Sequence, residues 1–331
     1  MKKVLFTLAA ILGLSLALVA TSCGGGSGSD DDDATPVAEN GGAGGSGSGS
    51  GSGGTGGGSS STSIPEGFVL VQGTTFNGTT ATAVTESSVF ISGRTIIIPN
   101  LLVCDHEVTQ AEYQSVMGSN PSFFFGTNKP VGRVTWYDAI MYCNRRSDGE
   151  GRTPCYKVNG NEDTNQWGYT PHAGNSISGT ITCDFNANGY RLPTEAEWEY
   201  LARGGSLANS GQTDYSGSNT IGDVAWYAGN AYYSDSTNPN HGTHQVKTKD
   251  PNGMTLYDMS GNVWEWCWDC WSDTITAGTP PTGAPSDWDR VIRGGSWEYD
   301  ASHCAVSFRS REHPYYRYSD YGFRVVCSRS E

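Results

Sequence analysis

The sequence predicts an α+β domain that is rich in loops and has few helices. Glycine is abundant: 28 of the chain's 45 glycines lie in residues 64–331, a share above the usual value of about 7 per cent. Helical periodicity is confined to three segments of this region. Elsewhere, short apolar runs separated by stretches rich in Gly, Asn and Asp are typical of strands and loops. Together these observations favour a mixed fold in which loops carry much of the chain.

The first 22 residues have the pattern of a bacterial lipoprotein signal peptide. Lys2 and Lys3 precede an apolar run from Val4 to Ala20, and "ATSC" then ends at Cys23. The pattern resembles a signal after whose cleavage Cys23 is the lipidated first residue. A secretory signal cleaved elsewhere and an uncleaved anchor are the alternatives. We therefore predict a bacterial protein, at the outer membrane or cell surface, that meets the membrane only through its lipid.

Residues 23–63 are predicted to be the lipidated cysteine and a flexible tether. The segment is mostly Gly and Ser, with an acidic cluster from Asp30 to Asp33. It has little apolar surface to bury and cannot offset the entropy lost on ordering. Forty such residues span roughly 35 Å root-mean-square, at about 5 to 6 Å per square root of residue number. The folded domain is therefore expected over residues 64–331.

Within this domain the clear elements are three strands and three helices. In chain order they are strands at "GFVLVQG" (67–73) and "RTIIIP" (94–99), helices at "EVTQAEYQSVMG" (107–118), "TWYDAIMYCNRRSDG" (135–149) and "LPTEAEWEYLARGG" (192–205), and a strand at "YGFRVVC" (321–327). The third helix has the clearest limits, because Thr194 and Glu197 have capping-box spacing and Gly204 can end it. We expect a capped, solvated helix there, since Glu195, Glu197 and Glu199 fall on different faces.

Charge and cysteine content exclude several classes of function. The formal net charge of -14 argues against nucleic acid and anionic lipid surfaces, because phosphate binding needs a basic face. Apart from Cys23, eight cysteines remain, an even number compatible with disulfides outside the cytoplasm. "CWDC" at residues 267–270 lacks the βαβ context of a redox motif. The histidines show no zinc-ligand spacing beside paired cysteines.

Six motifs in order resemble those of the formylglycine-generating enzyme, or sulfatase-modifying factor, family. They are "IPEGFVLVQGTTF", "HEVTQAEYQSVMGSNPS", "PVGRVTWYDAIMYCN", "GYRLPTEAEWEYLARGG", "NGMTLYDMSGNVWEWCWD" and "RVIRGGSW…YGFRVV". The resemblance covers residues 64–331 and implies the C-type lectin-like fold of this enzyme type. It also implies a structural calcium ion with Val263 and Glu265 as oxygen ligands. A buried Trp–Glu packing motif is the alternative for this segment.

The resemblance breaks at the family's catalytic thiols. In the family, two copper-binding thiols with four residues between them, just after "GGS", oxidise a substrate cysteine, because cuprous ion requires soft thiolate ligands. In "GGSWEYDASHC", Cys304 matches the second thiol and Tyr299 stands at the first. We therefore expect no copper and no enzymatic activity. A formylglycine-generating oxidoreductase acting on a sulfatase cysteine, and a calcium-dependent carbohydrate-binding lectin, are the alternative functions.

The stretch "FRSREHPYYRYSDY" (308–321) departs from both core and loop composition, with five aromatic rings and five charges in fourteen residues. It belongs to a C-terminal variable region at about residues 297–321. We call its candidate ligand-binding residues the variable set: Trp297, Tyr299, Asp300, Ser302, His303, Phe308, Ser310, Arg311, His313, Tyr315, Tyr316, Tyr318, Ser319, Asp320 and Tyr321. All except Trp297 are residue types reached from Asn codons by changing only adenines. Trp297, Glu298 and Glu312 are not reached in this way.

This codon pattern is that of targets of diversity-generating retroelements, which mutate template adenines. The chain thus resembles spirochaetal variable surface lipoproteins of that class. The set also has the composition of a paratope: Tyr gives rigid amphipathic area, Ser, His and Asp adapt their hydrogen bonds, and Arg and Trp are typical of binding hot spots. The sequence predicts a surface-displayed, non-catalytic protein that binds a protein or cell-surface ligand through a hypervariable site.

Overall fold

The computed structural model describes residues 64–76, 89–205, 212–233, 236–279, 282–283 and 288–329. The predicted signal peptide, Cys23 and the tether lie outside these residues. Among the helices of the described part, none has both the length and the apolar character needed to cross a membrane.

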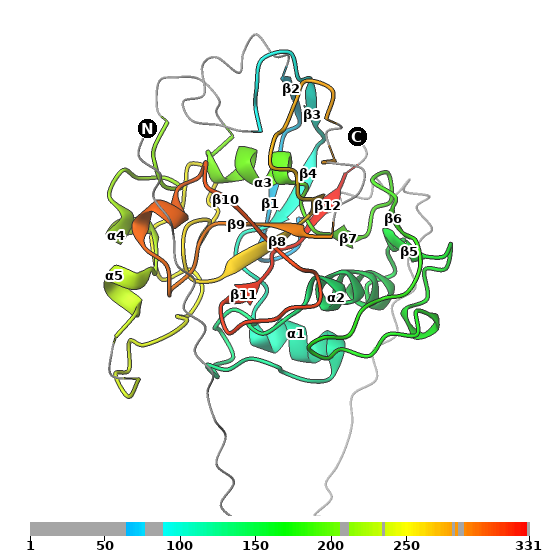
Figure 1. Cartoon of the computed structure of the whole chain (residues 1–331), viewed down its shortest axis with the longest axis horizontal. Helices are drawn as coiled ribbons and strands as arrows, with labels where there is room; N and C mark the ends of the chain where they lie inside the picture. The colour runs from blue at the N-terminus through cyan, green and yellow to red at the C-terminus, as the bar shows by residue number, and fades with distance from the viewer. Residues whose placement is uncertain are drawn as a thin grey trace, which may run out of the picture. The chain divides into compact units, whose positions relative to one another are not determined.

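Two four-stranded sheets form the framework (Figure 1). The first has the order β1–β4–β12–β7, and the second has the order β10–β9–β8–β11. Their strands are β1 (Phe68–Val71), β4 (Leu101–Cys104), β7 (Tyr190–Arg191), β12 (Val326–Ser328), β8 (Trp264–Cys270), β9 (Arg290–Arg293), β10 (Arg309–Glu312) and β11 (Tyr321–Gly322). Two antiparallel two-stranded sheets accompany them, β2 (Thr74–Phe76) with β3 (Ile96–Ile98) and β5 (Tyr156–Val158) with β6 (Ile181–Cys183).

The three predicted helices are confirmed as α1 (Gln110–Met117), α2 (Trp136–Gly149) and α3 (Glu195–Ala202). Each begins with a capping box, in which an N-cap threonine and an acidic residue three positions later exchange hydrogen bonds. Short helical turns follow at α4 (Ile221–Val224) and α5 (Ala228–Ala231), and 3₁₀ turns at Thr164–Gln166 and Ala301–Cys304. Few helices and many short strands in small sheets confirm the predicted loop-rich α+β class.

The prediction of a single strand at residues 321–327 is wrong. Its first part, β11, pairs in parallel with β8, whereas β12 crosses to the other sheet and pairs with β4 and β7. Arg324 lies between the two parts, fully buried. Its guanidinium donates to both carboxylate oxygens of Glu265 on β8, at 2.6 and 2.7 Å. The apolar pattern therefore belongs to two strands joined by a buried charge.

The prediction of a solvated third helix is also wrong. The carboxylates of Glu195, Glu197 and Glu199 are all buried. Each is paired with an arginine from a different strand, and the three partners are Arg309 on β10, Arg191 on β7 and Arg293 on β9. Sequence spacing placed the carboxylates on different faces correctly, but strands pack around the helix and supply a cation to each face. A buried carboxylate needs such a partner, because an unpaired charge in the interior is costly.

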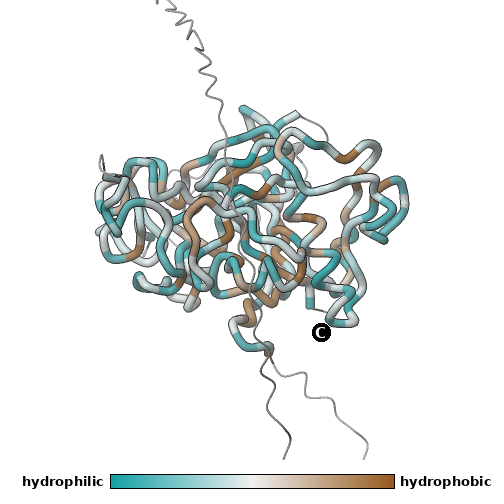
Figure 2. Tube along the Cα trace, turned by 90° about the horizontal axis from the view of Figure 1, so that it is seen from below, coloured by the Kyte–Doolittle hydropathy of each residue, from teal (hydrophilic) through white to brown (hydrophobic). Residues whose placement is uncertain are grey.

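Two clusters of buried apolar side chains fill the domain. One includes Trp264, Trp266 and Phe323, and the other includes Trp198 and Val291. In Figure 2 the hydrophobic segments run mainly through the interior and the hydrophilic ones mainly along outer loops. The tryptophans of β8 thus anchor the second sheet, whose outer strands β10 and β11 belong to the variable region.

Candidate ligand-binding surface

The variable region is an excursion of the chain between two strands of the second sheet. It leaves β9, passes through the "GGS" turn and the 3₁₀ turn Ala301–Cys304, forms β10, and returns by the loop 313–320 to β11. The turn requires glycine at Gly295, where φ is +73° and a Cβ would lie 2.7 Å from Sγ of Cys304. The framework glycine therefore lets the chain pass directly over the buried thiol.

Buried arginines hold the backbone of this excursion from beneath. Arg309 of β10 donates to both carboxylate oxygens of Glu195, at 2.6 and 2.8 Å. Arg293 is fully buried, pairs with Glu199 and donates to the carbonyls of Val306 and Phe308. These charge-assisted bonds are stronger than neutral ones and hold β10 against α3. The excursion is thus fastened by residues outside the variable set.

The structure brings most of the variable set to the surface, and we call the accessible members the variable surface. Exposed members are Asp300, Ser302, Arg311, Tyr316 and Tyr318; half-buried members are Tyr299, His303, Phe308, Ser310, His313, Tyr315 and Ser319. Trp297, Asp320 and Tyr321 are buried. The expectation that these three display their side chains is wrong.

Asp320 and Tyr321 are buried because β11 takes them into the second sheet. Tyr321 stands opposite Trp264 in the parallel pairing of β11 with β8. Its ring lies 5.6 Å from that of Trp266, and its hydroxyl donates to Glu312 at 3.0 Å. Asp320 accepts from the hydroxyl of Ser296 at 2.8 Å. Both residues therefore support the surface rather than form it.

Trp297 is buried beneath three rings that come from outside the variable region. Phe124 meets it edge to face at 5.1 Å, His241 at 5.0 Å, and Tyr232 stacks on it at 5.8 Å. Tyr232 is itself exposed, as are Phe123 and Phe125 of the neighbouring loop. Exposed large rings of this kind are typical of interaction surfaces.

Sequence reasoning missed these flanking rings. Their loop lies beside the variable surface, because the peptide N–H of Gly132 donates to the hydroxyl of Ser122, and a Cβ added at Gly132 would collide with the carbonyl of Ser319. The run "SFFF" at residues 122–125, directly after a proline, was the available signal, since three aromatic residues in a loop are unusual. The three phenylalanines directly follow the family-like motif "HEVTQAEYQSVMGSNPS", which ends at Ser122.

The first aromatic group of the variable surface covers β8. Tyr299 meets the buried ring of Trp264 at 5.3 Å, His303 lies 5.1 Å from Tyr299, and Phe308 lies 4.6 Å from His303. Asp300 caps the 3₁₀ turn that carries His303, accepting from the peptide N–H and hydroxyl of Ser302. These rings therefore pack over the buried Trp264, and the polar side chains of Asp300 and Ser302 lie at the adjoining turn.

The second aromatic group occupies the loop after β10. His313 and Tyr315 lie 3.9 Å apart, Tyr315 and Tyr316 4.7 Å, and Tyr316 and Tyr318 5.9 Å. His313 and Tyr315 also line a hollow of about 490 Å³ whose other walls include the highly exposed Trp288. The hollow is therefore lined both by members of the variable set and by residues outside it.

Ser310 and Arg311 lie on β10 between the two aromatic groups. The guanidinium of Arg311 approaches Asp273 at 3.5 Å and Asp289 at 3.4 Å, and it lies 5.5 Å from the ring of Trp271. Exposed ion pairs of this kind contribute little to stability. Arg311 can therefore exchange these partners for a ligand at low cost.

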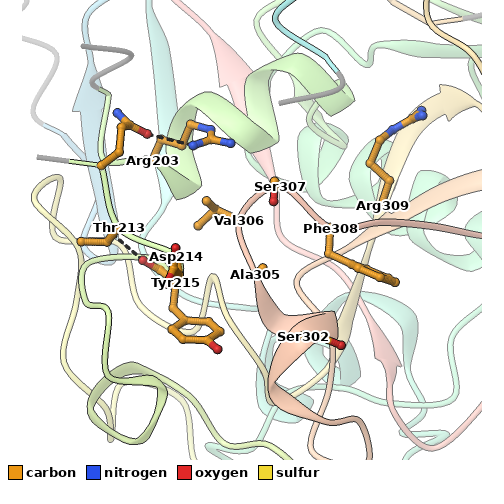
Figure 3. Close-up of a pocket in the computed structure, with 11 residues that line it drawn as sticks. Arg203, Thr213, Asp214, Tyr215, Ser302, Ala305, Val306, Ser307, Phe308 and Arg309 are labelled. Atoms are coloured by element: carbon orange, nitrogen blue, oxygen red, sulfur yellow. Dashed lines mark hydrogen bonds between the residues drawn. The ribbon is translucent and has the colours of Figure 1, made fainter. Parts of the chain in front are cut away.

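A larger hollow of about 840 Å³ opens beside the 3₁₀ turn (Figure 3). Ser302 and Phe308 of the variable surface line it together with Arg203, the C-cap residue of α3. The segment Thr213, Asp214 and Tyr215 lies on the other side of Ala305 and Val306. Changes at residues 302 and 308 therefore reshape a cavity whose remaining walls are framework.

Cys304 is fully buried below this turn. Burial raises the pKa of its thiol to about 12, and the nearby Asp300 carboxylate adds to the shift. A thiol with such a pKa stays protonated at neutral pH, and the thiolate is the form that attacks substrates and binds metals.

The predicted calcium ligands lie in a ring of donors. Glu265 accepts from Arg324 on both oxygens and from the indole of Trp198 at 2.8 Å, and the peptide N–H of Val263 donates to Glu107 at 3.0 Å. A guanidinium on both oxygens fits the alternative, a buried Trp–Glu motif, better than it fits a calcium ligand. The calcium ion and a calcium-dependent lectin function stay predictions.

Replacing Asp320 by Asn is expected to change the pH dependence of stability. Burial raises the pKa of Asp320 from 3.8 to about 6. The folded state thus binds the proton of Asp320 more tightly than the unfolded state does. Proton binding therefore contributes its full stabilisation below the unfolded pKa, and this stabilisation is lost as pH rises through about 6. Relative to the Asn variant, the parent should lose about 2 kcal/mol between roughly pH 4.5 and 7.5. Urea unfolding of both proteins at the two pH values measures this, and a pH-independent difference would contradict it.

This architecture, with small strands, few helices and long loops around a tryptophan-rich sheet, is the C-type lectin-like fold of the formylglycine-generating enzyme type. A family model described as the sulfatase-modifying factor enzyme 1-like domain matches residues 58–329. The chain belongs to this family, as its motifs predicted.

The proteins to which this chain is similar have names that describe different functions. Treponema denticola variable protein 1 has a solved structure with 36% identity and a TM-score of 0.66, over 79% of this chain and 95% of that one. The chaperone protein LppX of Paenibacillus barcinonensis is 37% identical over 277 residues, 81% of this chain and 91% of its own length. The formylglycine-generating enzyme of Streptomyces coelicolor is 38% identical over 149 residues, which are 42% of this chain and 46% of the enzyme.

Proposed function

We propose that this protein is a surface-displayed, non-catalytic receptor that binds a protein or cell-surface ligand through the variable surface. One observation carries the proposal: twelve members of the variable set reach the surface while the backbone beneath them is fastened by buried framework residues. Arg309 and Arg293 make that attachment through Glu195 and Glu199. Side chains on such a support can change without unfolding the domain.

The chemistry of the surface suits a protein partner. Tyr316 and Tyr318 offer large rings with few rotatable bonds, and Arg311 on β10 adds an exposed cation to the variable surface. The exposed Phe123 and Phe125 extend the surface with constant apolar area. Aromatic anchors beside arginine are typical of the energetic centre of protein interfaces.

Diversification by a retroelement is part of the proposal, and the similarity to a Treponema denticola variable protein supports it. The test is the neighbouring DNA, where we expect a near-repeat of the codons for residues 293–326 with adenines at the variable positions, close to a reverse transcriptase gene. Its absence would remove diversification from the proposal.

Sequencing the gene in many sister cells is a sharper test, because the structure divides the variable set into exposed and buried members. Tyr316 and Tyr318 are exposed and should be replaced by many residue types among expressed proteins. Tyr321 is buried and should be confined to large aromatic residues, although its codon mutates equally. Equal diversity at residues 316, 318 and 321 among folded proteins would contradict a surface supported in this way.

The protein is expected not to convert a sulfatase-type cysteine peptide to formylglycine. Tyr299 stands where the family has its first thiol, and the buried, protonated Cys304 is a poor ligand for cuprous ion. The assay is aerobic turnover of the peptide with added copper, with the Cys304→Ala variant as control. Turnover above that control would support the oxidoreductase alternative instead.

Anchoring by a lipid on Cys23 completes the proposed function. The "ATSC" junction places this cysteine where a lipoprotein signal is cleaved. We expect the mature protein to partition into detergent and Cys23→Ser to move it to the soluble fraction. Unchanged partitioning of the variant would indicate an uncleaved anchor.

A further inference from the structure

Away from the variable surface, the end of β4 and the start of α1 bring three metal-ligating side chains together. They are Cys104, His106 and Glu112, and one ligand atom from each lies within 4.8 Å of the others. Nε2 of His106 is 3.3 Å from Oε2 of Glu112 and 3.9 Å from Sγ of Cys104. Among the residues that the structure describes, no second group of three or more His, Cys, Asp or Glu side chains is this close.

The other ring nitrogen of His106 has the partner that metal-binding histidines usually have. Nδ1 lies 2.5 Å from Oδ1 of Asp105, and Oδ2 of Asp105 accepts from Nζ of Lys247 at 2.7 Å. A carboxylate on one imidazole nitrogen fixes the tautomer and directs the other nitrogen to the metal. The ring is also held in place by the backbone of Gly67, where a Cβ would lie 3.3 Å from the ring carbon Cε1.

Glu112 keeps one oxygen turned toward the histidine. Its Oε1 faces Arg146 at 3.4 Å, whereas Oε2 accepts the capping hydrogen bonds of Thr109 at 2.8 Å and faces His106. A carboxylate oxygen has more than one lone pair and can retain a cap while it binds an ion. The side chains of His106 and Glu112 are 14% and 28% exposed, so an ion can enter from solvent although Cys104 is buried.

We propose that Cys104, His106 and Glu112 bind a divalent cation of the zinc type, with Asp105 as the positioning residue. One sulfur, one imidazole nitrogen and one carboxylate oxygen are the ligands that zinc accepts in tetrahedral sites, and three protein ligands leave the fourth position for water. The ion would join the last residue of β4 to the first turn of α1. This site is independent of the variable surface and of the proposed function.

The test is titration of the purified, chelator-treated full chain with Zn²⁺, and with Co²⁺ as a spectroscopic probe. We expect one ion per chain, absorption from a thiolate–cobalt bond, and a higher melting temperature with Zn²⁺, because a ligand that binds only the folded state stabilises it. His106→Gln should weaken binding at least about tenfold, and Asp105→Asn about ten- to a hundredfold, as for other groups that orient metal ligands.

Matched controls separate the site from incidental binding. His172→Gln makes the same chemical change at an exposed histidine and should leave the affinity unchanged, and Cys143→Ser should retain the thiolate absorption that Cys104→Ser removes. If Cys104→Ser fails to fold, His106→Gln and Asp105→Asn still decide. No binding, binding without thiolate absorption, or binding that survives His106→Gln would overturn the proposal and leave His106 as an imidazolium between two carboxylates.

Discussion

Replacing Glu199 by Gln is expected to lower the free energy of unfolding by about 3 to 5 kcal/mol, the usual cost of breaking a buried ion pair. Glu199 is fully buried and accepts from Arg293 and, at 3.0 Å, from Arg203. The substitution keeps the shape of the side chain and removes its charge, which leaves two guanidinium groups undercompensated in the interior. The loss is comparable with a large part of the stability of a domain. Urea unfolding of the parent and the variant measures it.

The same substitution at Glu162 is the control. Glu162 is half exposed, and its partner Lys157 lies 3.5 Å away, so Glu162→Gln should cost no more than about 1 kcal/mol. Since Arg293 also donates to the carbonyls of Val306 and Phe308, Glu199→Gln should make residues 301–312 more sensitive to limited proteolysis. Equal losses for the two variants would show that α3 does not fasten the variable region through charge.

Tyr321→Ser is expected to cost about 3 to 5 kcal/mol, as truncation of a buried aromatic residue does. The ring is buried between Trp266 and Tyr318, and its hydroxyl is bonded to Glu312. By contrast, the triple variant of Tyr315, Tyr316 and Tyr318 to Ser should change stability by no more than about 0.5 kcal/mol per site, because these rings lie at the surface. A thermal melt of each variant separates the two expectations.

The comparison is sharp because all four tyrosines lie within seven residues and receive the same substitution. A near-native melt for the triple variant and an unfolded or aggregated product for Tyr321→Ser would show that one short segment contains both the binding surface and its support. Loss of the fold in the triple variant would instead place these rings in the core, and the proposed receptor function would lose its main support.

The local elements were predictable where a residue's own neighbours in the chain decide its structure. The capping box of Thr194 and Glu197 lies within one turn of chain, and α3 begins where it predicts. The family and its fold were predictable from six ordered motifs. Composition and codon type select the variable set, whose role in binding stays a prediction, and most of its members reach the surface.

Burial and charge pairing needed the tertiary structure, because the partners come from distant parts of the chain. Glu195 meets Arg309, so it is not solvated as its local pattern suggests. Glu265 meets Arg324, a partner that its own motif does not contain. Tyr321 and Tyr318 are the same residue type in the same short segment, yet pairing with β8 buries Tyr321.

Cys104, His106 and Glu112 show no zinc-ligand spacing, and they meet only because α1 folds back beside the end of β4. Local sequence sets helix caps and side-chain chemistry, since both depend on neighbouring residues. The packing of sheets against α3 decides which of those side chains remain available to a ligand, since burial depends on what the rest of the chain places around them.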